Sequence, residues 1–373
     1  MKTAFELKSK IKRNSLVFFS YMRVTDSLYR SNYIDYLLRK QKKPRALIKN
    51  ELNLIRDYWK CDPMTYYRYR LFEKNLTKEE LLDYVPPYYF YNYYIPSIYN
   101  ESKIKLAASK IQMSEYFKSK HIPIPETVSV AINGIIYANG ERIDYDGFID
   151  RLKHSEARKF FMKPENGQGG KGILRIEKNN GEIFINNKVV SRKSFDDIIK
   201  RHDYLIQEGL IQRSDIMEIY PDSVNTLRVV TQNFDGKPQI SAVYLKMGRN
   251  GTYVDNSSSG GLSTYIDMES GRSADFAINH NMNKKLDRHP DTGFVFDGFI
   301  IRDWQKIKEA ILDIAGKAVD FPDIGWDIAI VEGGIAVIEL NLNWGIDLQG
   351  IVGGMRKMLN IEPFIAPVKV TFR

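Results

Sequence analysis

The sequence predicts an α+β fold, and three observations carry that prediction. From residue 127 onward, short apolar runs typical of strands alternate with polar turns, and stretches with helical spacing lie between them. A loop that holds four glycines and a lysine within residues 167–172 stands between two of these runs. Two further apolar runs flank a Glu-Gly-Gly turn at residues 332–334 and carry acidic side chains. The loop and the acidic strand pair locate the part of the chain that we expect to perform chemistry.

The composition is that of a soluble, globular chain. Its 373 residues are 43% hydrophobic and 27% charged, and this length is enough for two or three lobes with a substantial core. The single cysteine, Cys61, excludes an internal disulfide framework and fits a reducing compartment. The first residues lack the apolar core of a signal peptide, and no run reaches the roughly 18 apolar residues of a membrane span. We therefore expect a cytoplasmic protein.

Basic charge is concentrated at the front of the chain. Residues 1–120 contain 24 Lys and Arg against 12 Asp and Glu, together with 16 of the 23 tyrosines. Apolar positions in residues 1–60 recur at helical spacing, which predicts amphipathic helices with a basic outer face. Three interpretations remain: a packed helical subdomain with a solvated basic face, a docking surface for an anionic membrane or an assembly, and a nucleic-acid-binding surface. We favour the first and expect no nucleic acid, because no nucleic-acid-binding module is recognisable.

The other elements follow in order along the chain. Residues 82–100, rich in Pro and Tyr, predict an irregular connection, and a helix is then expected from Ser102 to Lys120 until two prolines end it. Strands are expected near residues 128–137, 158–163, 173–177, 182–186, 203–208, 225–234, 238–247, 263–267, 326–331 and 335–340. Helices are expected near residues 145–153, 194–201 and 303–318, the last with a core stripe of Trp304, Ile307, Ile311, Ile314, Ala315 and Val319.

The glycine-rich loop at residues 167–172 reads G-x-G-x-x-G, but its surroundings exclude the dinucleotide fingerprint. That fingerprint needs a helix after the loop, whereas residues 173–177 are typical of a strand. The Walker pattern fails because Gly172, not Ser or Thr, follows Lys171. A protein-kinase loop fails because His-Arg-Asp and Asp-Phe-Gly do not occur, and because Lys163 lies on the strand before the loop. A flap that closes over phosphates is favoured over a purely structural turn.

The two strands that flank the Glu-Gly-Gly turn bring oxygen ligands together. If the hairpin is centred on the middle glycine, Val331 faces Ile335. The same hairpin sets Asp327 opposite Glu339, with Cβ atoms roughly 4.5–5.5 Å apart, and Asn341 points to the same face as Glu339. Two carboxylates this close need a compensating cation, and oxygen ligands suit Mg²⁺, which typically also binds substrate phosphates. A metal site is favoured over the alternative of solvent-facing charges on an edge hairpin.

The order of these segments resembles the ATP-grasp superfamily over residues 103–350. Ala-Ser-Lys at residues 108–110 resembles the entry segment of the family, and Phe-Met-Lys-Pro at residues 161–164 resembles its strand lysine before the flap. The basic, tyrosine-rich front, with the Asn-Thr-Leu-Arg and Asp-Asn…Gly-Gly segments, is most similar to the sugar-transfer-associated ATP-grasp proteins of bacterial surface-polysaccharide loci. The resemblance implies two α+β lobes that grip ATP, preceded by a basic, mainly helical N-terminal extension.

The resemblance also implies roles for individual residues. ATP would be held by Lys110, Lys163, Gly167, Gln168, Gly169, Gly170 and Lys171, by the hinge strand residues Gln207, Glu208, Gly209 and Leu210, and by Asp215 at the ribose. Mg²⁺ would be held by Asp327, Glu339 and Asn341. Arg228, with Lys246, would stabilise the charge on the transferred phosphate, and the substrate would contact Asn225, Asp255, Asn256, Gly260 and Gly261.

The function implied by the resemblance is ATP- and Mg²⁺-dependent carboxylate–amine ligation through an acyl phosphate. The carboxylate would belong to a surface polysaccharide, its sugar precursor or a small molecule, and the amine would be an amino acid or another amine. Two alternatives stay open: a phosphotransferase on the same fold, and a non-catalytic ATP-binding scaffold of a glycan-assembly complex. We expect residues 1–100 to form the basic front and residues 101–373 the ATP-grasp domain, with a small flap lobe at about 156–210 and a large lobe at 211–373.

Overall fold

The structure is a computed structural model of the chain, and it describes residues 26–167, 169–179, 181–256, 260–279, 284–346 and 349–363. The helices expected before residue 26 therefore lie outside the described residues. The chain forms two compact units: one comprises residues 101–342, and the other combines the residues before 101 with those after 342. This division differs from the expected one, which placed residues 343–373 with the ATP-grasp domain.

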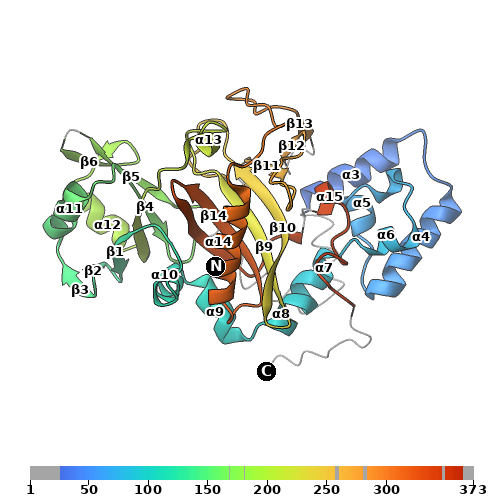
Figure 1. The fold of residues 1–373 in the computed structure, drawn as a ribbon, viewed down its shortest axis with the longest axis horizontal. Coiled ribbons are helices and arrows are strands. Elements are labelled where there is room, and N and C mark those ends of the chain that lie inside the picture. The colour runs from blue at the N-terminus through green and yellow to red at the C-terminus, as the bar shows by residue number, and fades with distance from the viewer. Residues whose placement is uncertain are drawn as a thin grey trace. The chain divides into compact units, whose positions relative to one another are not determined.

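Residues 127–208 form a sheet of eight strands in which every pair is antiparallel (Figure 1). The order in the sheet is β3 (Glu141–Ile143), β2 (Ile135–Ala138), β1 (Thr127–Ile132), β8 (Tyr204–Glu208), β4 (Lys159–Pro164), β5 (Leu174–Asn179), β6 (Glu182–Ile185) and β7 (Lys188–Val189). Helices α11 (Tyr145–His154) and α12 (Arg192–Ile199) bury Phe148 and Phe195 against it, with ring centroids 4.8 Å apart. This sheet begins at β1, whereas the small flap lobe was expected to start at about residue 156.

The single strand expected over residues 128–137 is two strands, β1 and β2. Asn133 and Gly134 connect them and have positive φ angles of 51° and 75°. An Asn-Gly pair with both residues in this region forms the two-residue turn whose twist suits a hairpin. The sequence signal for the turn was therefore present inside the apolar run.

The single helix expected from Ser102 to Lys120 is also interrupted. Helix α9 (Glu101–Ala108) ends before Ser109, which is extended at φ −92° and ψ 112°. The Ser109 hydroxyl accepts a hydrogen bond from the Gln112 backbone N–H at 3.1 Å, which caps α10 (Lys110–Ser119). The break places Lys110 in the first turn of α10, next to the flap.

The second sheet of the same unit has seven strands, again with antiparallel pairing. Its order is β13 (Lys284–Leu286), β12 (Ala277–Asn279), β11 (Leu262–Tyr265), β10 (Lys237–Met247), β9 (Thr226–Phe234), β14 (Asp323–Val331) and β15 (Gly334–Asn341). Helix α14 (Trp304–Lys317) contacts β10 and β15, and α13 (Ser214–Met217) is a single turn. The predicted stripe of α14 is buried except for Val319, which is exposed because it lies beyond the end of the helix.

The other unit is helical in the part that the structure describes. Its helices are α3 (Ser27–Leu38), α4 (Arg45–Trp59), α5 (Thr65–Arg68), η1 (Leu71–Glu73), α6 (Lys78–Leu82), α7 (Pro87–Tyr89), the π-helix η2 (Phe90–Tyr94), α8 (Ile95–Ile98) and α15 (Gln349–Val352). No described helix combines the length and apolar character needed to traverse a lipid bilayer.

The expectation of an irregular connection at residues 82–100 was wrong, because this segment is mostly helical. Pro87 stands in the first turn of α7, where its fixed φ favours a helix. Phe90 and Tyr94 stack with ring centroids 5.5 Å apart, and Tyr89 and Tyr93 do so at 5.8 Å. Aromatic pairs four residues apart meet on one face of a helix, so the tyrosines that suggested irregularity stabilise helical structure.

Two contacts explain why the segment after residue 342 belongs to this unit. The Gln349 side chain donates to the Val85 carbonyl at 2.6 Å and accepts from the Val85 N–H at 2.8 Å. Trp344, which is buried, packs edge-on against Phe90 with ring centroids 4.7 Å apart. The C-terminal segment therefore completes the hydrogen bonding and the core of the helical unit.

Candidate active site

The hairpin of β14 and β15 places Asp327 opposite Glu339, as predicted, but by a different register. The turn contains two residues, so Val331 pairs with Gly334, and the expected pairing of Val331 with Ile335 was wrong. A bulge at Ile338 then shifts the register by one residue and brings Asp327 opposite Glu339. The bulge lies beside the carboxylates and therefore determines which acidic residues meet.

Asp327 is buried between two cations. The Arg228 guanidinium of β9 donates to it with Nε–Oδ1 at 2.7 Å and Nη2–Oδ2 at 3.1 Å, and Lys246 Nζ of β10 donates to Oδ1 at 3.1 Å. Burial alone would raise the pKa of Asp327, but Arg228 and Lys246 outweigh it and hold the pKa well below its usual range. The carboxylate is therefore ionised at neutral pH.

Lys246 also connects Asp327 to a second carboxylate. Its Nζ lies 3.7 Å from Asp255, and Asp255 accepts hydrogen bonds from the Thr226 backbone N–H at 3.1 Å and from the Thr226 hydroxyl. Thr226 stands two residues before Arg228 on β9 and so faces the same side of the sheet. The Asn-Thr-Leu-Arg segment thus supplies both the arginine and the group that orients Asp255.

Asp327, Glu339 and Asn341 offer a set of oxygen ligands that fits Mg²⁺. The Asn341 amide lies 3.4 Å from Asp327 Oδ2, and the Glu339 side chain is 42% exposed with Lys110 Nζ at 4.0 Å. Within the described part of the chain, no three His, Cys, Asp or Glu side chains gather into a metal cluster. Mg²⁺ commonly uses one or two carboxylates and completes its shell with water and phosphate, so two carboxylates and an amide suffice.

The glycine-rich flap connects β4 to β5, as predicted, and contacts Lys110. Lys110 Nζ donates to the Gly167 carbonyl at 2.5 Å. Glu165, just before the flap, accepts hydrogen bonds from the Ser109 hydroxyl and from the Ile111 N–H, the latter at 3.0 Å. Glu165 was not among the predicted site residues, although it directly follows the strand lysine and its proline. This residue fixes the position of the α10 N-terminus relative to the flap.

The flap needs glycine at two positions for different reasons. A Cβ on Gly167 would lie 2.7 Å from Pro164 Cγ, so a side chain would displace the start of the flap. Gly170 has a φ of +73°, and a Cβ there would lie 3.2 Å from Val254. Tyr253 donates from its hydroxyl to the Ile173 carbonyl at 3.1 Å, so the far end of the flap rests on residues 253–254. Gln168, predicted to contact ATP, lies outside the described residues.

Lys163 lies on β4 and points at Gln207 of β8. Its Nζ donates to Gln207 Oε1 at 2.9 Å, and the Gln207 amide donates to the Pro125 carbonyl at 3.2 Å. Burial lowers the pKa of Lys163 to about 8, because the charged ammonium loses hydration, while Glu339 opposes this effect and Lys110 adds to it. The ammonium of Lys163 therefore loses its proton at a lower pH than that of an ordinary lysine.

We expect nucleotide affinity to weaken as pH rises through the pKa of Lys163. Between about pH 7 and about pH 9 the ammonium loses its proton, and a charge-assisted hydrogen bond to phosphate, worth about tenfold or more in affinity, is lost. Calorimetry with ADP should show this weakening, together with proton uptake on binding near pH 8. The affinity of Lys163→Arg for ADP should not change over the same pH range, because the guanidinium group stays charged. An equally steep profile in Lys163→Arg would assign the titration to another group.

Two cavities meet at Lys163 and Glu339. The first, of about 100 Å³, is also lined by Lys110, Gly167, Gly169, Gly170, Lys171 and Gln207 among the predicted residues, with apolar walls such as Met113 and Phe117. The second, of about 130 Å³, is also lined by Gly170, Glu208, Leu210, Lys246, Asp255, Asn256 and Asp327, with apolar walls such as Phe161 and Ile338. Cations, carboxylates and the flap therefore line two cavities that share wall residues, and both cavities also have apolar walls.

Other predicted site residues do not line either cavity. They are Gly209, Asp215, Asn225, Arg228, Gly260, Gly261 and Asn341. Asp215 forms a bidentate pair with Arg213 at 2.6 and 2.8 Å, and the Asn225 amide donates to the carbonyls of Ile216 and Tyr220 at 2.8 and 2.9 Å. Arg228 donates to Asp327, which itself lines the second cavity. Asn279 donates to the Gly260 carbonyl at 2.6 Å. These side chains and carbonyls support neighbouring loops and charges.

Comparison with known proteins places the chain among ATP-grasp proteins. A family model described as sugar-transfer associated ATP-grasp matches residues 89–360. No curated protein matches. Similar solved structures include N5-carboxyaminoimidazole synthetase from Staphylococcus aureus complexed with ADP, at 13% identity and a TM-score of 0.37, covering 64% of this chain and 46% of that one.

Two further solved structures are similar at the same level. D-alanyl-alanine synthetase A from Vibrio cholerae O1 biovar eltor str. N16961 has 13% identity and a TM-score of 0.37, covering 68% of this chain and 60% of that one. L-amino acid ligase from Bacillus licheniformis has 10% identity and a TM-score of 0.38, covering 71% of this chain and 48% of that one. The chain thus spans about half to three fifths of the length of these proteins. By the family model that matches most of its length, the chain belongs to the sugar-transfer associated ATP-grasp family.

Proposed function

We propose that the protein is an ATP- and Mg²⁺-dependent ligase that joins a carboxylate to an amine. One observation carries the proposal: Lys163, Lys246, Asp327 and Glu339 surround one space under a glycine-rich flap. Such a space suits a triphosphate, because its cations and flap N–H groups bind phosphate oxygens while its carboxylates bind the accompanying metal. Membership of the ATP-grasp family supports the same interpretation.

The nucleotide would occupy the two connected cavities. Phe161, Leu210 and Ile338 offer an apolar surface for the base, and Lys110, Lys163 and the flap bind the phosphates. Asp327, Glu339 and Asn341 would hold Mg²⁺, which supplies charge neutralisation at the phosphates when bound. Lys246 of β10 lines the second cavity, and Arg228 donates a hydrogen bond to Asp327 without lining that cavity. We assign Arg228 a positioning role here, in addition to the role expected from the family resemblance.

The proposed chemistry uses electrostatics and positioning without a nucleophilic side chain. A substrate carboxylate oxygen attacks the γ-phosphorus of ATP, the bond to the β–γ bridging oxygen breaks, and ADP leaves. An amine then attacks the acyl carbon, phosphate leaves, and the amine loses a proton to give the amide. Lys246 stands where it would neutralise negative charge on the transferred group. The five histidines need no role in this scheme.

The family description supports a proposal for the class of the substrates. The family is associated with sugar transfer, so we propose a sugar-linked carboxylate as the acid and an amino acid or other amine as its partner. Cys61 is buried and not in a disulfide, which fits a reducing compartment, and we place the reaction in the cytoplasm.

The test is whether ADP forms only when both substrates are present. We expect purified protein, screened with uronic acids and amino acids in the presence of Mg²⁺ and ATP, to release ADP and phosphate for pairs of acid and amine but not for either alone. Mass spectrometry of the product should find the mass of an amide. A stable phosphorylated product without an amide would instead assign a phosphotransferase, and ATP binding without turnover in any mixture would assign a non-catalytic role.

A further inference from the structure

An open groove of about 980 Å³ lies beside the flap, in the lobe built on the eight-stranded sheet. We call it the flap groove, and its lining comes from within residues 164–174 around the flap, residues 185–204 from β6 to the start of β8, and Asn133 of the β1–β2 turn. The labelled elements α12, β6, β1 and β2 lie in this one lobe in Figure 1. Ile185 and Tyr204, which are buried in the hydrophobic core of the lobe, also line the groove. Small-molecule sites commonly measure about 300–1,000 Å³, so the groove has room for several linked rings.

Basic side chains line the flap groove from three separate segments. Lys171 belongs to the flap and Lys188 to β7, and the chain that follows α12 contributes three more groups: Lys200, Arg201 and His202. None of the four Lys and Arg side chains forms an ion pair with a residue that the structure describes. Cations are favourable at the end of a helix, which suits Lys200 and Arg201, but Lys171 and Lys188 do not lie at a helix end. Their charges are therefore available to a ligand in the groove.

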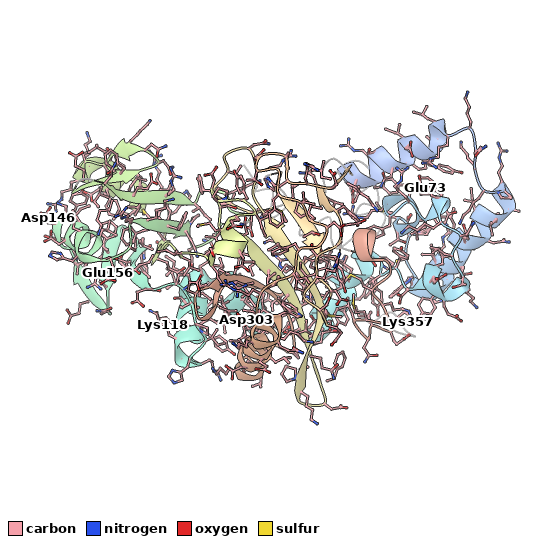
Figure 2. The ribbon with its side chains drawn as sticks, turned by 45° about the horizontal axis from the view of Figure 1, so that its top comes forward. Glu73, Lys118, Asp146, Glu156, Asp303 and Lys357 are labelled. Atoms are coloured by element: carbon pink, nitrogen blue, oxygen red, sulfur yellow. The ribbon has the colours of Figure 1, made fainter. Side chains whose placement is uncertain are left out.

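Acidic side chains are almost absent from the flap groove, although the lobe contains many. Residues 127–208 hold 12 Asp and Glu and 14 Lys and Arg, yet Asp203 is the only Asp or Glu among the described residues that line the groove. Its Oδ1 accepts a hydrogen bond from the Asn133 backbone N–H at 2.7 Å, which fastens the β1–β2 turn to the start of β8. Asp146 and Glu156, labelled in Figure 2, belong to this lobe but do not line the groove. Four positive charges thus share the groove with one carboxylate, which favours an anionic ligand.

The neutral polar residues of the flap groove suit a ligand that carries hydroxyl groups. Three asparagines and a serine are among the lining residues: Asn133, Asn166, Asn186 and Ser194. Carboxamides and hydroxyls both donate and accept hydrogen bonds, as sugar hydroxyls do. Nucleic acid fits less well, because its bases stack on exposed aromatic rings. Tyr204 is 4% exposed, and no Phe or Trp is among the described residues that line the groove.

We propose that the flap groove binds an acidic oligosaccharide, whose carboxylates pair with the Lys and Arg side chains and whose hydroxyls bond to the Asn and Ser residues. The choice of a sugar chain among anions that carry hydroxyl groups rests on the proposed function, and the family description supports it. Pro164, Gly167 and Lys171 line both this groove and the first of the two nucleotide cavities. The sugar chain would therefore be held against the same flap that borders the proposed nucleotide site.

The experiment is calorimetry with the full chain, a short oligogalacturonate and a short oligomannuronate, in the absence of ATP. We expect an acidic chain to bind and its affinity to fall as salt rises, because the contacts join solvent-exposed charges. The neutral maltooligosaccharide of the same length should bind at least about tenfold more weakly. Lys188→Gln combined with Arg201→Gln should weaken binding of the acidic chain by about threefold for each exposed ion pair that is lost. Saturating Mg²⁺ and ADP should not displace the acidic chain, because the groove lies outside the nucleotide cavities.

A matched pair of changes in the same lobe serves as the control. Lys193→Gln combined with Arg142→Gln removes two exposed cations that do not line the groove, and binding should stay unchanged. Circular dichroism would establish that all variants keep their secondary structure.

Several outcomes would overturn the proposal. They are no binding of either acidic chain, equal binding of the neutral chain, binding that the Lys188 and Arg201 variant leaves intact, and an equal loss in the control variant. Full displacement by Mg²⁺ and ADP would place the anion in the nucleotide cavities instead. Tighter binding of a short single-stranded DNA than of both acidic chains would assign the groove to nucleic acid. Because neither ATP nor an amine is present, these results do not depend on whether the ligase assay finds an amide.

Discussion

Glu339→Gln will lower turnover by more than about 100-fold and leave the fold intact. Loss of groups that merely orient metal ligands commonly costs 10–100-fold, so loss of Glu339, which we propose as a direct ligand, should cost at least the upper end of that range. Glu339 is well suited to this test because it is partly exposed, and Lys110 at 4.0 Å is its nearest ion-pair partner among the described residues. Its neutralisation therefore leaves no buried charge without a partner.

The measurement need not wait for the natural substrates. The affinity for ADP, measured by calorimetry with and without Mg²⁺, should depend on Mg²⁺ in the wild-type protein and not in Glu339→Gln. Glu332→Gln is a matched control, because Glu332 lies in the turn of the same hairpin, is exposed, and has Arg302 at 3.9 Å as its nearest described cation. If Glu339→Gln keeps wild-type turnover and the Mg²⁺ dependence of ADP binding, the metal assignment fails.

Asp327→Asn will destabilise the protein by about 3–5 kcal/mol, the usual cost of removing one partner of a buried ion pair. Arg228 would lose the carboxylate to which it donates, and Lys246 would keep Asp255 at 3.7 Å as its ion-pair partner among the described residues. Unfolding in urea can be followed by tryptophan fluorescence, to which the fully buried Trp326 beside Asp327 contributes, and the midpoint should fall in the variant. An unchanged urea midpoint would show that burying Arg228 and Lys246 does not require the Asp327 carboxylate.

Two further measurements separate charge loss from a general packing defect. Arg228→Met added to Asp327→Asn should recover part of the lost stability, because it removes the cation that Asp327 neutralises in the wild-type protein. The pKa of Asp327 is held below its ordinary value of 3.8, so its pairing stabilises the folded state fully above that pH. As pH falls below about 3.8 toward the folded pKa, this contribution is lost, and the difference between wild type and Asp327→Asn should shrink. A difference that stays constant in acid would point to packing instead.

Local sequence patterns were sufficient to predict the features that depend on neighbouring residues. Alternation of apolar residues gave most of the strands, and the strand-to-strand setting of the glycine loop identified it as a flap, because period and turn chemistry act within a few residues. The pairing of Asp327 with Glu339 was also predicted correctly. It was correct because two local features that were not predicted, the two-residue turn and a bulge, cancel each other's effect on the register. The two-residue turn alone would set Asp327 opposite Ile338, and the bulge at Ile338 restores the predicted partner.

Features that depend on contacts between distant segments became visible only in the folded chain. Arg228 and Asp327 are 99 residues apart, and they meet because β9 and β14 are neighbours in a sheet whose strand order no local pattern encodes. The same applies to Lys110, which reaches Gly167 because Ser109 interrupts the helix before it. Asp215 and Asn225 have suitable side chains at suitable spacing, but nearby partners hold them away from the cavities. Sequence fixes which groups are available, whereas packing between strands and loops fixes which of them face a common space.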